Sequence, residues 1–159
     1  MRLKSCLIVC ALALQMVAVA SAQQSRNVKS VAGNGGARPS DWPMYGRDLA
    51  GSHYNPTEKL LTPATVSRLK PKWVFETHAD VSSQPTVVNG VVYFGSWDGY
   101  QYAVDAKTGQ KLWAFEVGEA SRSGAAYADG VIYFGDIKGR LYALDAKTGA
   151  LKWKTRIDD

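Results

Sequence analysis

The sequence repeats itself with a period of about 40 residues over its second half. Residues 90–113 read GVVYFGSWDGYQYAVDAKTGQKLW, residues 130–153 read GVIYFGDIKGRLYALDAKTGALKW, and 14 of the 24 positions are identical. The same step leads back from Trp113 to Trp73, although the stretch before Trp73 lacks the DAKTG segment. A repeat of this length indicates a supersecondary unit that buries its apolar surface by stacking on its neighbours.

Each unit alternates with the period of a strand and is divided by turn residues. The dipeptides Asn89-Gly90 and Asp129-Gly130 lie between short β-branched and aromatic runs, which predicts tight hairpins. Further turns around Asp98-Gly99 and at residues 106–109 divide the unit into four short strands. We therefore expect an all-β fold, a partial β-propeller of four-stranded antiparallel blades. A β-sandwich uses similar strand spacing, but it gives no reason to repeat the same turn residues at a fixed period.

The length of the repeating region limits the number of blades. Residues 41–159 have room for about three units of this size, which end at Trp73, Trp113 and Trp153. Closed propellers have about four to eight blades, so this number does not close a ring. We expect a fragment of a larger ring of about eight blades, with a self-assembling partial propeller as the alternative.

The N-terminal part of the chain has the composition of processing and linker segments. Arg2 and Lys4 precede an apolar run of roughly 14 residues, and Ala20-Ser21-Ala22 then fits a signal-peptidase site, so residues 1–22 are predicted to be a cleaved signal peptide. A membrane anchor is the alternative, but a bilayer span needs about 20 apolar residues. Residues 23–40 lack apolar periodicity and are predicted to be a flexible leader. We expect a periplasmic or secreted protein with no membrane anchor after cleavage.

The remaining composition argues against several other classes of protein. Both cysteines, Cys6 and Cys10, lie in the predicted signal peptide, so the mature chain would have no thiol, disulfide or covalently attached haem. Without residues 1–22 the chain has 17 basic and 14 acidic residues, and their dispersion argues against nucleic-acid binding. The two histidines, His53 and His78, have no zinc-ligand spacing, and we expect no metal site in this chain.

The end of each repeat resembles a known structural motif. The pattern Ala-x-Asp-Ala-Lys-Thr-Gly-x-x-x-Trp, at residues 103–113 and 143–153, looks like the tryptophan-docking motif of propellers with pyrroloquinoline quinone (PQQ) repeats. The aspartate can accept hydrogen bonds from turn amides, the glycine permits positive φ, and the indole supplies a large flat surface. In that family the tryptophan packs against the neighbouring blade. The residues expected to form this structural docking motif are Asp105, Gly109, Trp113, Asp145, Gly149 and Trp153.

A second resemblance lies upstream of the repeats. The segment DWPMYGRD at residues 41–48, with residues 54–56 and 69–73, resembles the mature start of PQQ-dependent quinoprotein dehydrogenases, and looks closest to polyvinyl-alcohol dehydrogenase-like members. The resemblance implies a parent enzyme that holds PQQ and Ca²⁺ at the propeller axis, oxidises an alcohol and passes electrons to a c-type cytochrome. The chain alone is expected to be inactive. The alternative is a non-catalytic propeller that binds proteins, as in outer-membrane protein assembly.

Blade geometry and the resemblance together select candidate cofactor-binding residues. The loops that enter the innermost strands, residues 81–84 and 121–124, would rim the funnel of the propeller. Dehydrogenases of this family place a glutamate in the first loop and a cysteine pair in the second, where this chain has serines and an arginine. Arg122 is the main candidate because a guanidinium can bind carboxylates with two hydrogen bonds, and Ser82 and Ser83 are the others. No catalytic residue is expected here, since the ligands of Ca²⁺ and the catalytic base would lie in later blades.

Overall fold

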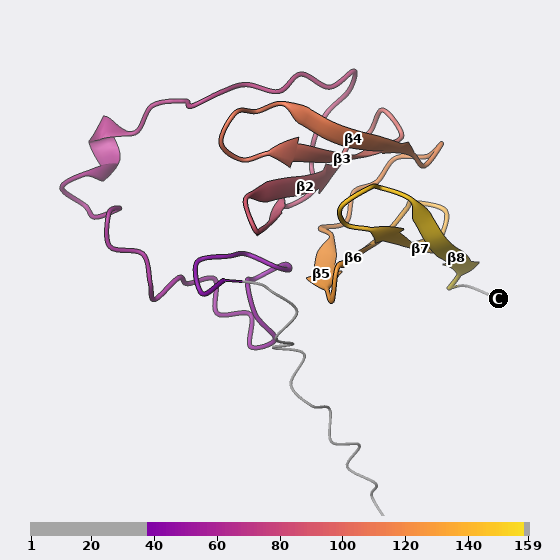
Figure 1. Cartoon of the computed structure of the whole chain (residues 1–159), viewed down its shortest axis with the longest axis horizontal. Helices are drawn as coiled ribbons and strands as arrows, with labels where there is room; N and C mark the ends of the chain where they lie inside the picture. Colours follow the sequence, from indigo (N-terminus) through magenta and orange to yellow (C-terminus); the bar gives the residue numbers. More distant parts are fainter. Residues whose placement is uncertain (1–37, 158–159) are drawn as a thin grey trace, which may run out of the picture.

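The computed structural model describes residues 38–157. The predicted signal peptide and most of the predicted leader lie outside the described residues. Within the described range, no helix has the length and apolar character that a membrane crossing requires. Two separate four-stranded antiparallel sheets form the body of the structure, and each corresponds to one 40-residue repeat (Figure 1).

The strands of each sheet follow one another in chain order. The first blade consists of β1 (Thr86–Val88), β2 (Val91–Gly95), β3 (Tyr100–Asp105) and β4 (Lys111–Glu116). The second blade consists of β5 (Ala126–Ala128), β6 (Val131–Gly135), β7 (Arg140–Asp145) and β8 (Leu151–Arg156). This order confirms the expected four-stranded antiparallel blades.

The innermost hairpins form where the sequence predicted them. Asn89 and Gly90 both have positive φ, 53° and 81°, and Asp129 and Gly130 have 48° and 80°. Two successive residues of positive φ are typical of the type I′ turn, whose twist matches that of the flanking strands. Strand β1 accordingly pairs with β2, and β5 with β6, in the same register.

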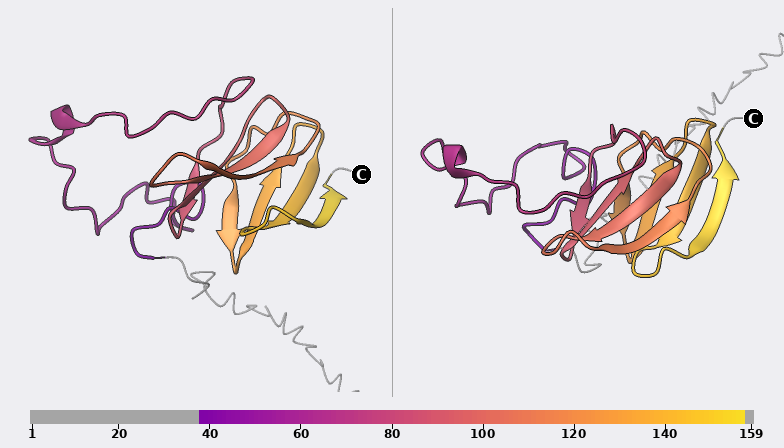
Figure 2. Two further views of the ribbon diagram at one scale, coloured as in Figure 1. Left: turned by 45° about the horizontal axis from the view of Figure 1, so that its top comes forward. Right: turned by 90° about the horizontal axis from the view of Figure 1, so that it is seen from above.

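The two faces of each blade make different contacts. Tyr93, Ala103 and Trp113 are directly opposite one another across β2, β3 and β4, so their side chains lie on one face, which we call the forward face of the first blade. Residues from the opposite face, the back face, of the second blade pack against it. The cluster buried between the blades comprises Tyr93, Ala103, Trp113, Val117, Ala125, Ile132, Phe134, Tyr142, Leu144 and Ala146. The main core is therefore the junction between two sheets stacked face to face (Figure 2).

The stretch that ends at Trp73 does not form a third sheet in the described part of the chain. Residues 41–85 contain a short 3₁₀ helix, η1 (Val66–Arg68), and an isolated bridge between Trp42 and Val87. Pro56 and Pro63 disfavour strands in the first part of this stretch, and residues 73–75, although extended, have no neighbouring strand among the described residues. The 40-residue step thus counts three docking tryptophans, while complete sheets are found for two of the three units.

Residues 73–75 nevertheless occupy the place of an outer strand against the first blade. Trp73 and Phe75 pack on a second cluster of Phe94, Tyr102 and Val104 on the back face of that blade. Phe75 lies edge-on to Phe94 and Tyr102, with ring centroids 5.8 Å and 5.4 Å apart. Phe115, which has the equivalent position in the next repeat, contacts Tyr142 of the second blade in a comparable way, at 6.2 Å. This short extended segment therefore repeats the packing of β4 without a sheet of its own.

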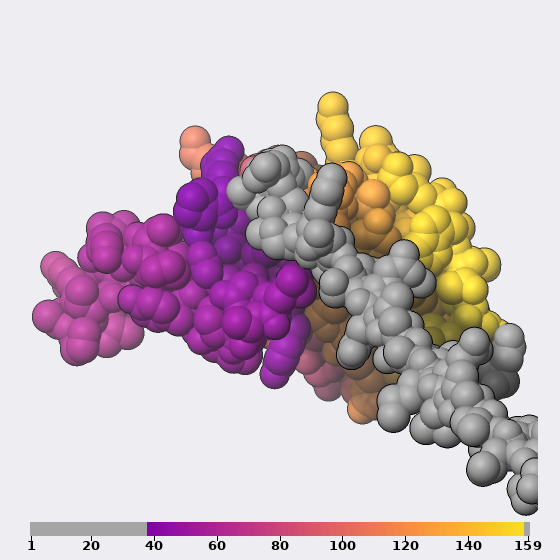
Figure 3. Space-filling model, turned by 90° about the horizontal axis from the view of Figure 1, so that it is seen from below, coloured from indigo at the N-terminus to yellow at the C-terminus, as the bar shows by residue number. Residues whose placement is uncertain are grey.

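The N-terminal segment, residues 38–60, bonds to the innermost strands of both blades, and Figure 3 shows it in indigo and purple, continuous with the magenta residues that follow it. Trp42 exchanges two backbone hydrogen bonds with Val87 of β1, and Tyr127 of β5 donates its backbone N–H to the Pro43 carbonyl. The segment thereby ties together the innermost strands of the two blades.

Candidate functional site

The two ends of the blades differ in the loops that they present. One end carries the hairpin turns at residues 89–90 and 129–130 together with the DAKTG turns. The other end carries the loops that enter each blade, residues 79–85 and 117–125, and the β2–β3 and β6–β7 turns. We call this second end the rim. Backbone hydrogen bonds hold it together, because Trp97 donates its N–H to Asp80 and Ile137 donates its N–H to Ala120.

The DAKTG turns at the opposite end receive an indole from the preceding unit. The Trp73 indole donates to the Ala106 carbonyl at 3.0 Å, and the Trp113 indole donates to the Ala146 carbonyl at 3.0 Å. A Cβ on Gly109 would lie 2.7 Å from Trp73, and one on Gly149 would lie 2.7 Å from Trp113. Glycine is required at these two positions both by positive φ and by the close approach of the ring.

Asp105 and Asp145 organise the two DAKTG turns. Asp105 accepts hydrogen bonds from the backbone N–H and the hydroxyl of Thr108, and Asp145 does the same with Thr148. In both turns the backbone N–H of the threonine, followed by its hydroxyl, holds the pKa of the carboxyl group below its usual value. These carboxylates are therefore occupied in building turns that present a glycine and a carbonyl to the tryptophan.

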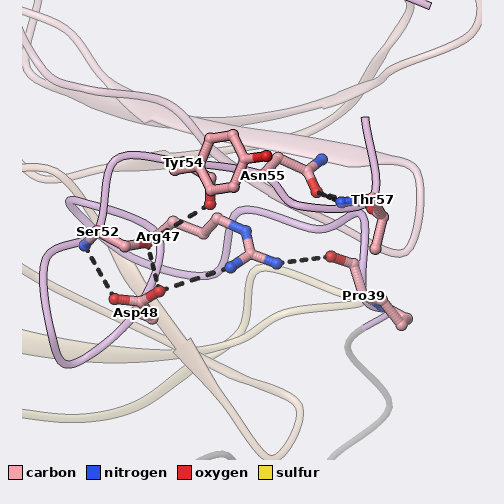
Figure 4. Close-up of polar contacts among 7 residues, drawn as sticks. All are labelled: Pro39, Arg47, Asp48, Ser52, Tyr54, Asn55 and Thr57. Atoms are coloured by element: carbon pink, nitrogen blue, oxygen red, sulfur yellow. Dashed lines mark hydrogen bonds and ion pairs between the residues drawn. The ribbon is translucent and has the colours of Figure 1, made fainter. Parts of the chain in front are cut away.

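The N-terminal motif that carries the second resemblance forms a compact turn of its own (Figure 4). Gly46 and Arg47 both have positive φ, and the Arg47 guanidinium donates to the Pro39 carbonyl at 2.8 Å and lies 3.5 Å from Asp48. Asp48 accepts hydrogen bonds from the hydroxyl and the backbone N–H of Ser52, which hold the pKa of the Asp48 carboxyl below its usual value. The charged residues of the motif therefore close a local turn that sets the direction in which Trp42 and Pro43 reach the blades.

At the rim, the three predicted cofactor-binding residues have different surroundings. Ser83 is buried, and its hydroxyl donates to the Gly95 carbonyl at 2.8 Å and accepts from the Gly95 N–H at 3.0 Å. Ser123 makes the same pair of bonds with Gly135 in the second blade. This arrangement repeats in both blades and fixes the entry loop to β2 or β6, so the Ser83 hydroxyl is already engaged within the blade.

Ser82 and Arg122 are brought together by a residue that sequence reasoning missed. The Trp97 indole donates to the Ser82 hydroxyl at 2.8 Å, and the Arg122 guanidinium carbon lies 4.1 Å from the centroid of the Trp97 ring. Trp97 was identifiable in principle, because it lies outside the 40-residue tryptophan period and stands where the next unit has Ile137. The rim therefore carries an exposed arginine stacked on an exposed tryptophan.

A buried polar layer lies directly beneath this stack. Ser96, Gln101 and Ser121 are fully buried, and the Ser121 N–H donates to the Ser96 carbonyl. The Ser121 hydroxyl lies 3.5 Å from Gln101 Oε1 and 3.4 Å from the Gly135 carbonyl, whereas Gln101 Nε2 has no hydrogen-bond partner among the described residues. The layer joins the two blades at the rim and fixes the backbone next to Arg122.

Acidic residues at the rim are engaged with tyrosines. Asp98 accepts a hydrogen bond from Tyr102, and burial, followed by that bond, raises the pKa of the Tyr102 hydroxyl to about 12. In the second blade Asp136 accepts from Tyr142 and Arg140. Burial acts to raise the Asp136 pKa, but the hydrogen bonds from Arg140 and Tyr142 outweigh it, so this pKa lies below its usual value. Both carboxylates are therefore engaged in hydrogen bonds within their own blades.

The described residues contain no cluster of potential metal ligands. Across residues 38–157, no group of three or more histidine, cysteine, aspartate or glutamate side chains is placed to hold a metal ion. His53 packs edge-on to Tyr45, and the backbone of His78 bonds to Asp98. At the rim, the exposed groups that lie together are the Arg122 guanidinium and the Trp97 ring.

Comparison with known proteins identifies a common family. Residues 42–151 match the family model described as the β-propeller domain of glucose, ethanol and alcohol dehydrogenases. The chain is 36% identical over 114 residues to the dehydrogenase subunit of the quinone alcohol dehydrogenase of Gluconobacter oxydans, covering 69% of this chain and 15% of the relative. It is 37% identical over 71 residues to polyvinylalcohol dehydrogenase of a Pseudomonas species, covering 45% of this chain and 11% of the relative.

The fold comparison leads to the same group of proteins. The crystal structure of the quinohemoprotein alcohol dehydrogenase of Comamonas testosteroni superposes with a TM-score of 0.67 and 29% identity, covering 79% of this chain and 20% of that one. The chain thus spans between about a tenth and a fifth of the proteins that it resembles.

Proposed function

The chain belongs to the family of β-propeller dehydrogenases that act on glucose, ethanol and other alcohols, and we propose that it supplies two blades of an exported PQQ-dependent alcohol dehydrogenase. The parent enzyme would oxidise an alcohol and pass the electrons to a cytochrome. The observation that carries the proposal is the extent of the family match, which begins at Trp42 in the N-terminal motif and continues through the first blade to Leu151, where β8 of the second blade begins.

The N-terminal motif supports the enzyme over a general propeller scaffold. A scaffold needs stacked blades, and the 40-residue repeat alone provides them. The compact turn around Arg47 and the hydrogen bonds from residues 42–43 to β1 and β5 are additional to the repeat. The segment resembles the start of quinoprotein dehydrogenases and occupies the innermost side of both blades.

The rim carries one group, the Arg122 guanidinium, that is suited to binding a carboxylate of PQQ. PQQ is a planar quinone that carries three carboxylates, and Arg122 presents an exposed guanidinium with no hydrogen bond or ion pair to any described residue. Arg122 would bind a carboxylate of the cofactor. Ser82 reaches the same place through Trp97, while the Ser83 hydroxyl is engaged with Gly95. Bound PQQ would supply the oxidising group for the alcohol, and the Ca²⁺ ligands and base are assigned to no residue between 38 and 157.

Export and the electron acceptor are further parts of the proposal. The basic start, apolar run and Ala20-Ser21-Ala22 site of residues 1–22 support delivery to the periplasm or beyond it. The name quinohemoprotein, given to the relative from Comamonas testosteroni, pairs a quinone with a haem. A c-type cytochrome is accordingly the proposed acceptor.

The test is reconstitution of the complete product of the gene that encodes this chain. The purified protein is incubated with PQQ and Ca²⁺, and the alcohol-dependent reduction of a dye is followed with primary and secondary alcohols. We expect reduction that requires PQQ, Ca²⁺ and alcohol together, and samples that lack one component are the controls. Absence of reduction with every alcohol, together with absence of bound quinone after gel filtration, contradicts the proposal.

A further inference from the structure

The Trp97 ring at the rim is fixed from two sides. Its backbone N–H donates to the Asp80 carbonyl at 2.9 Å, and its indole N–H donates to the Ser82 hydroxyl at 2.8 Å. Both partners belong to the loop that enters the first blade. With one ring nitrogen and one backbone nitrogen bonded to the same loop, the indole is oriented although 42% of the residue is exposed.

Arg122 lies with its guanidinium over this ring, at 4.1 Å from the centroid. A guanidinium that stacks on an aromatic face keeps its N–H groups in the plane of the group, pointing away along its edge. The backbone beneath is also fixed, because the preceding residue, Ser121, is fully buried and bonded to Ser96. Arg122 is thus restrained at its backbone and by the contact of its guanidinium with the Trp97 ring, while the residue remains exposed to solvent.

Comparison of the two repeats shows that a blade can form without this stack. Structural positions recur from one repeat to the next, as Ser83 and Ser123, Gly109 and Gly149, and Trp73 and Trp113 do. The three members of the stack do not recur: Trp97 corresponds to Ile137, and Ser82 corresponds to Arg122 itself. The second blade folds with the same register without such a stack, so blade formation does not require it.

We propose that Trp97 is a positioning residue that holds Arg122 ready to bind a carboxylate of a planar aromatic ligand, and that Ser82 sets the orientation of Trp97. The inference rests on the proposed function in one respect, because PQQ is the aromatic carboxylate that this family membership suggests. A charge-assisted hydrogen bond to a carboxylate requires a particular orientation of the guanidinium. Contact with the indole restricts that orientation before the ligand binds, which lowers the entropic cost of binding. Ser82 is thereby assigned to the support of Trp97 and does not itself contact the ligand.

The test measures binding of two probes to the complete chain by calorimetry. The first probe is PQQ, and the second is benzene-1,3,5-tricarboxylate, which is aromatic and anionic but has no redox chemistry. The variants are Arg122→Gln, Trp97→Ala, Trp97→Phe, Ser82→Ala and the double variant of Trp97→Ala with Arg122→Gln. Ile137→Ala, at the corresponding turn of the second blade, is the matched control, and thermal unfolding checks that each variant folds.

We expect Arg122→Gln to weaken binding by about tenfold or more, since a charge-assisted bond is lost. Trp97→Ala should weaken it by about twofold to fivefold, the range of an exposed cation–π contact. Trp97→Phe should restore most of the affinity because the aromatic face remains, and Ser82→Ala should have the smallest effect. The double variant should bind no more weakly than Arg122→Gln alone, because Trp97 acts through Arg122. The ¹⁵N–¹H resonance of Arg122 Nε should also lose its ring-current shift in Trp97→Ala.

Other results would overturn the inference in distinct ways. Equal binding by Trp97→Ala and the original chain, or additive losses in the double variant, would show that Trp97 does not act through Arg122. Absence of binding of both probes to the original chain removes the carboxylate site, while dye reduction by the complete gene product judges the proposed enzyme separately. Binding of the tricarboxylate without binding of PQQ supports the anion site and counts against the assignment of the cofactor.

Discussion

The forward faces of the two blades have the same residues and different surroundings. Tyr93, Ala103 and Trp113 on the first blade correspond to Tyr133, Ala143 and Trp153 on the second, in the same register. The second blade covers the first face, so Trp113 is 9% exposed and donates to Ala146. Trp153 is 42% exposed, and its indole N–H has no hydrogen-bond acceptor among the described residues.

The difference teaches that the docking tryptophan is an interface residue whose contribution depends on the next blade. Both tryptophans follow the same DAKTG sequence and lie on the outer strand of a complete sheet. Burial also changes the neighbouring tyrosine, since it raises the pKa of the Tyr93 hydroxyl, which donates to the Ala146 carbonyl, to about 12. The sheet alone thus forms with the tryptophan exposed, and a DAKTG turn of a following blade gives the indole its acceptor.

Replacement of the two tryptophans should give the largest contrast. Trp113→Ala removes a buried indole and its hydrogen bond, and we expect a loss of about 3–5 kcal/mol in the free energy of unfolding. Trp153→Ala removes a ring that is largely in contact with solvent, and the loss should stay below about 1 kcal/mol. Urea unfolding followed by circular dichroism measures both. Similar losses for the two variants would contradict the assignment of Trp113 to the interface.

The glycine under the buried indole provides the next test. Gly149→Ala places a Cβ 2.7 Å from the Trp113 ring at a φ of +73°, so it should cost about 3 kcal/mol. Gly130→Ala is the matched control, because its φ is +80° and a Cβ there meets no atom within 4 Å. The control should lose only about 1–2 kcal/mol, from its backbone conformation. Equal losses at the two positions would mean that the ring and the turn are not in close contact.

Replacement of the buried amide of Gln101 at the rim should raise stability, whereas the preceding replacements lower it. Gln101 is fully buried with Nε2 unpaired among the described residues, whereas the second blade has Leu141 at the same position. Gln101→Leu should raise the free energy of unfolding by about 1 kcal/mol, because an unpaired buried donor is removed and Ser121 remains close to the Gly135 carbonyl. Leu141→Gln, at a partly exposed site, should change stability by less than about 0.5 kcal/mol. Destabilisation by Gln101→Leu would show that the amide is satisfied in solution.

The aspartates of the two DAKTG turns predict a small dependence of stability on pH. Hydrogen bonds from Thr108 and Thr148 lower the pKa of Asp105 and Asp145 in the folded state. Their stabilising contribution is therefore fully present above the unfolded pKa, near 4, and is lost as the pH falls through the lower folded values. Urea midpoints between pH 7 and pH 3 should fall less steeply below pH 4 in the Asp105→Asn, Asp145→Asn double variant. Identical slopes in the double variant and the original chain would show that these carboxylates do not contribute to the pH dependence of stability.

Much of the blade architecture is predictable from local signals. Asn89-Gly90 and Asp129-Gly130 specify type I′ turns, and the period-two pattern between turns then determines which residues pair. The tryptophan period identifies the indoles of the docking interface, because it spaces them at the blade repeat. The same period does not show whether strands surround Trp73, since a strand requires a neighbouring strand as well as its own sequence.

The rim is less predictable because its contacts join residues that follow no repeat. The sequence places Ser83 in a loop that enters a blade, but it does not show that the Ser83 hydroxyl bonds to Gly95, a contact that depends on how the loop folds back on β2. Trp97 and Arg122 meet across the junction between two blades, 25 positions apart, without a motif that connects them. The departure of Trp97 from the 40-residue period is the sequence signal that would have identified it.

Exchange of the indole N–H groups with deuterium tests the account most directly. In a ¹⁵N-labelled chain, assigned by single Trp→Phe variants, the Trp113 indole N–H should exchange slowly, because it is buried and bonded to the Ala146 carbonyl. The Trp153 indole N–H should exchange at the rate of a solvent-exposed group. Slow exchange at Trp113 with rapid exchange at Trp153 is the predicted result, and equally rapid exchange at both would contradict the stacked blades.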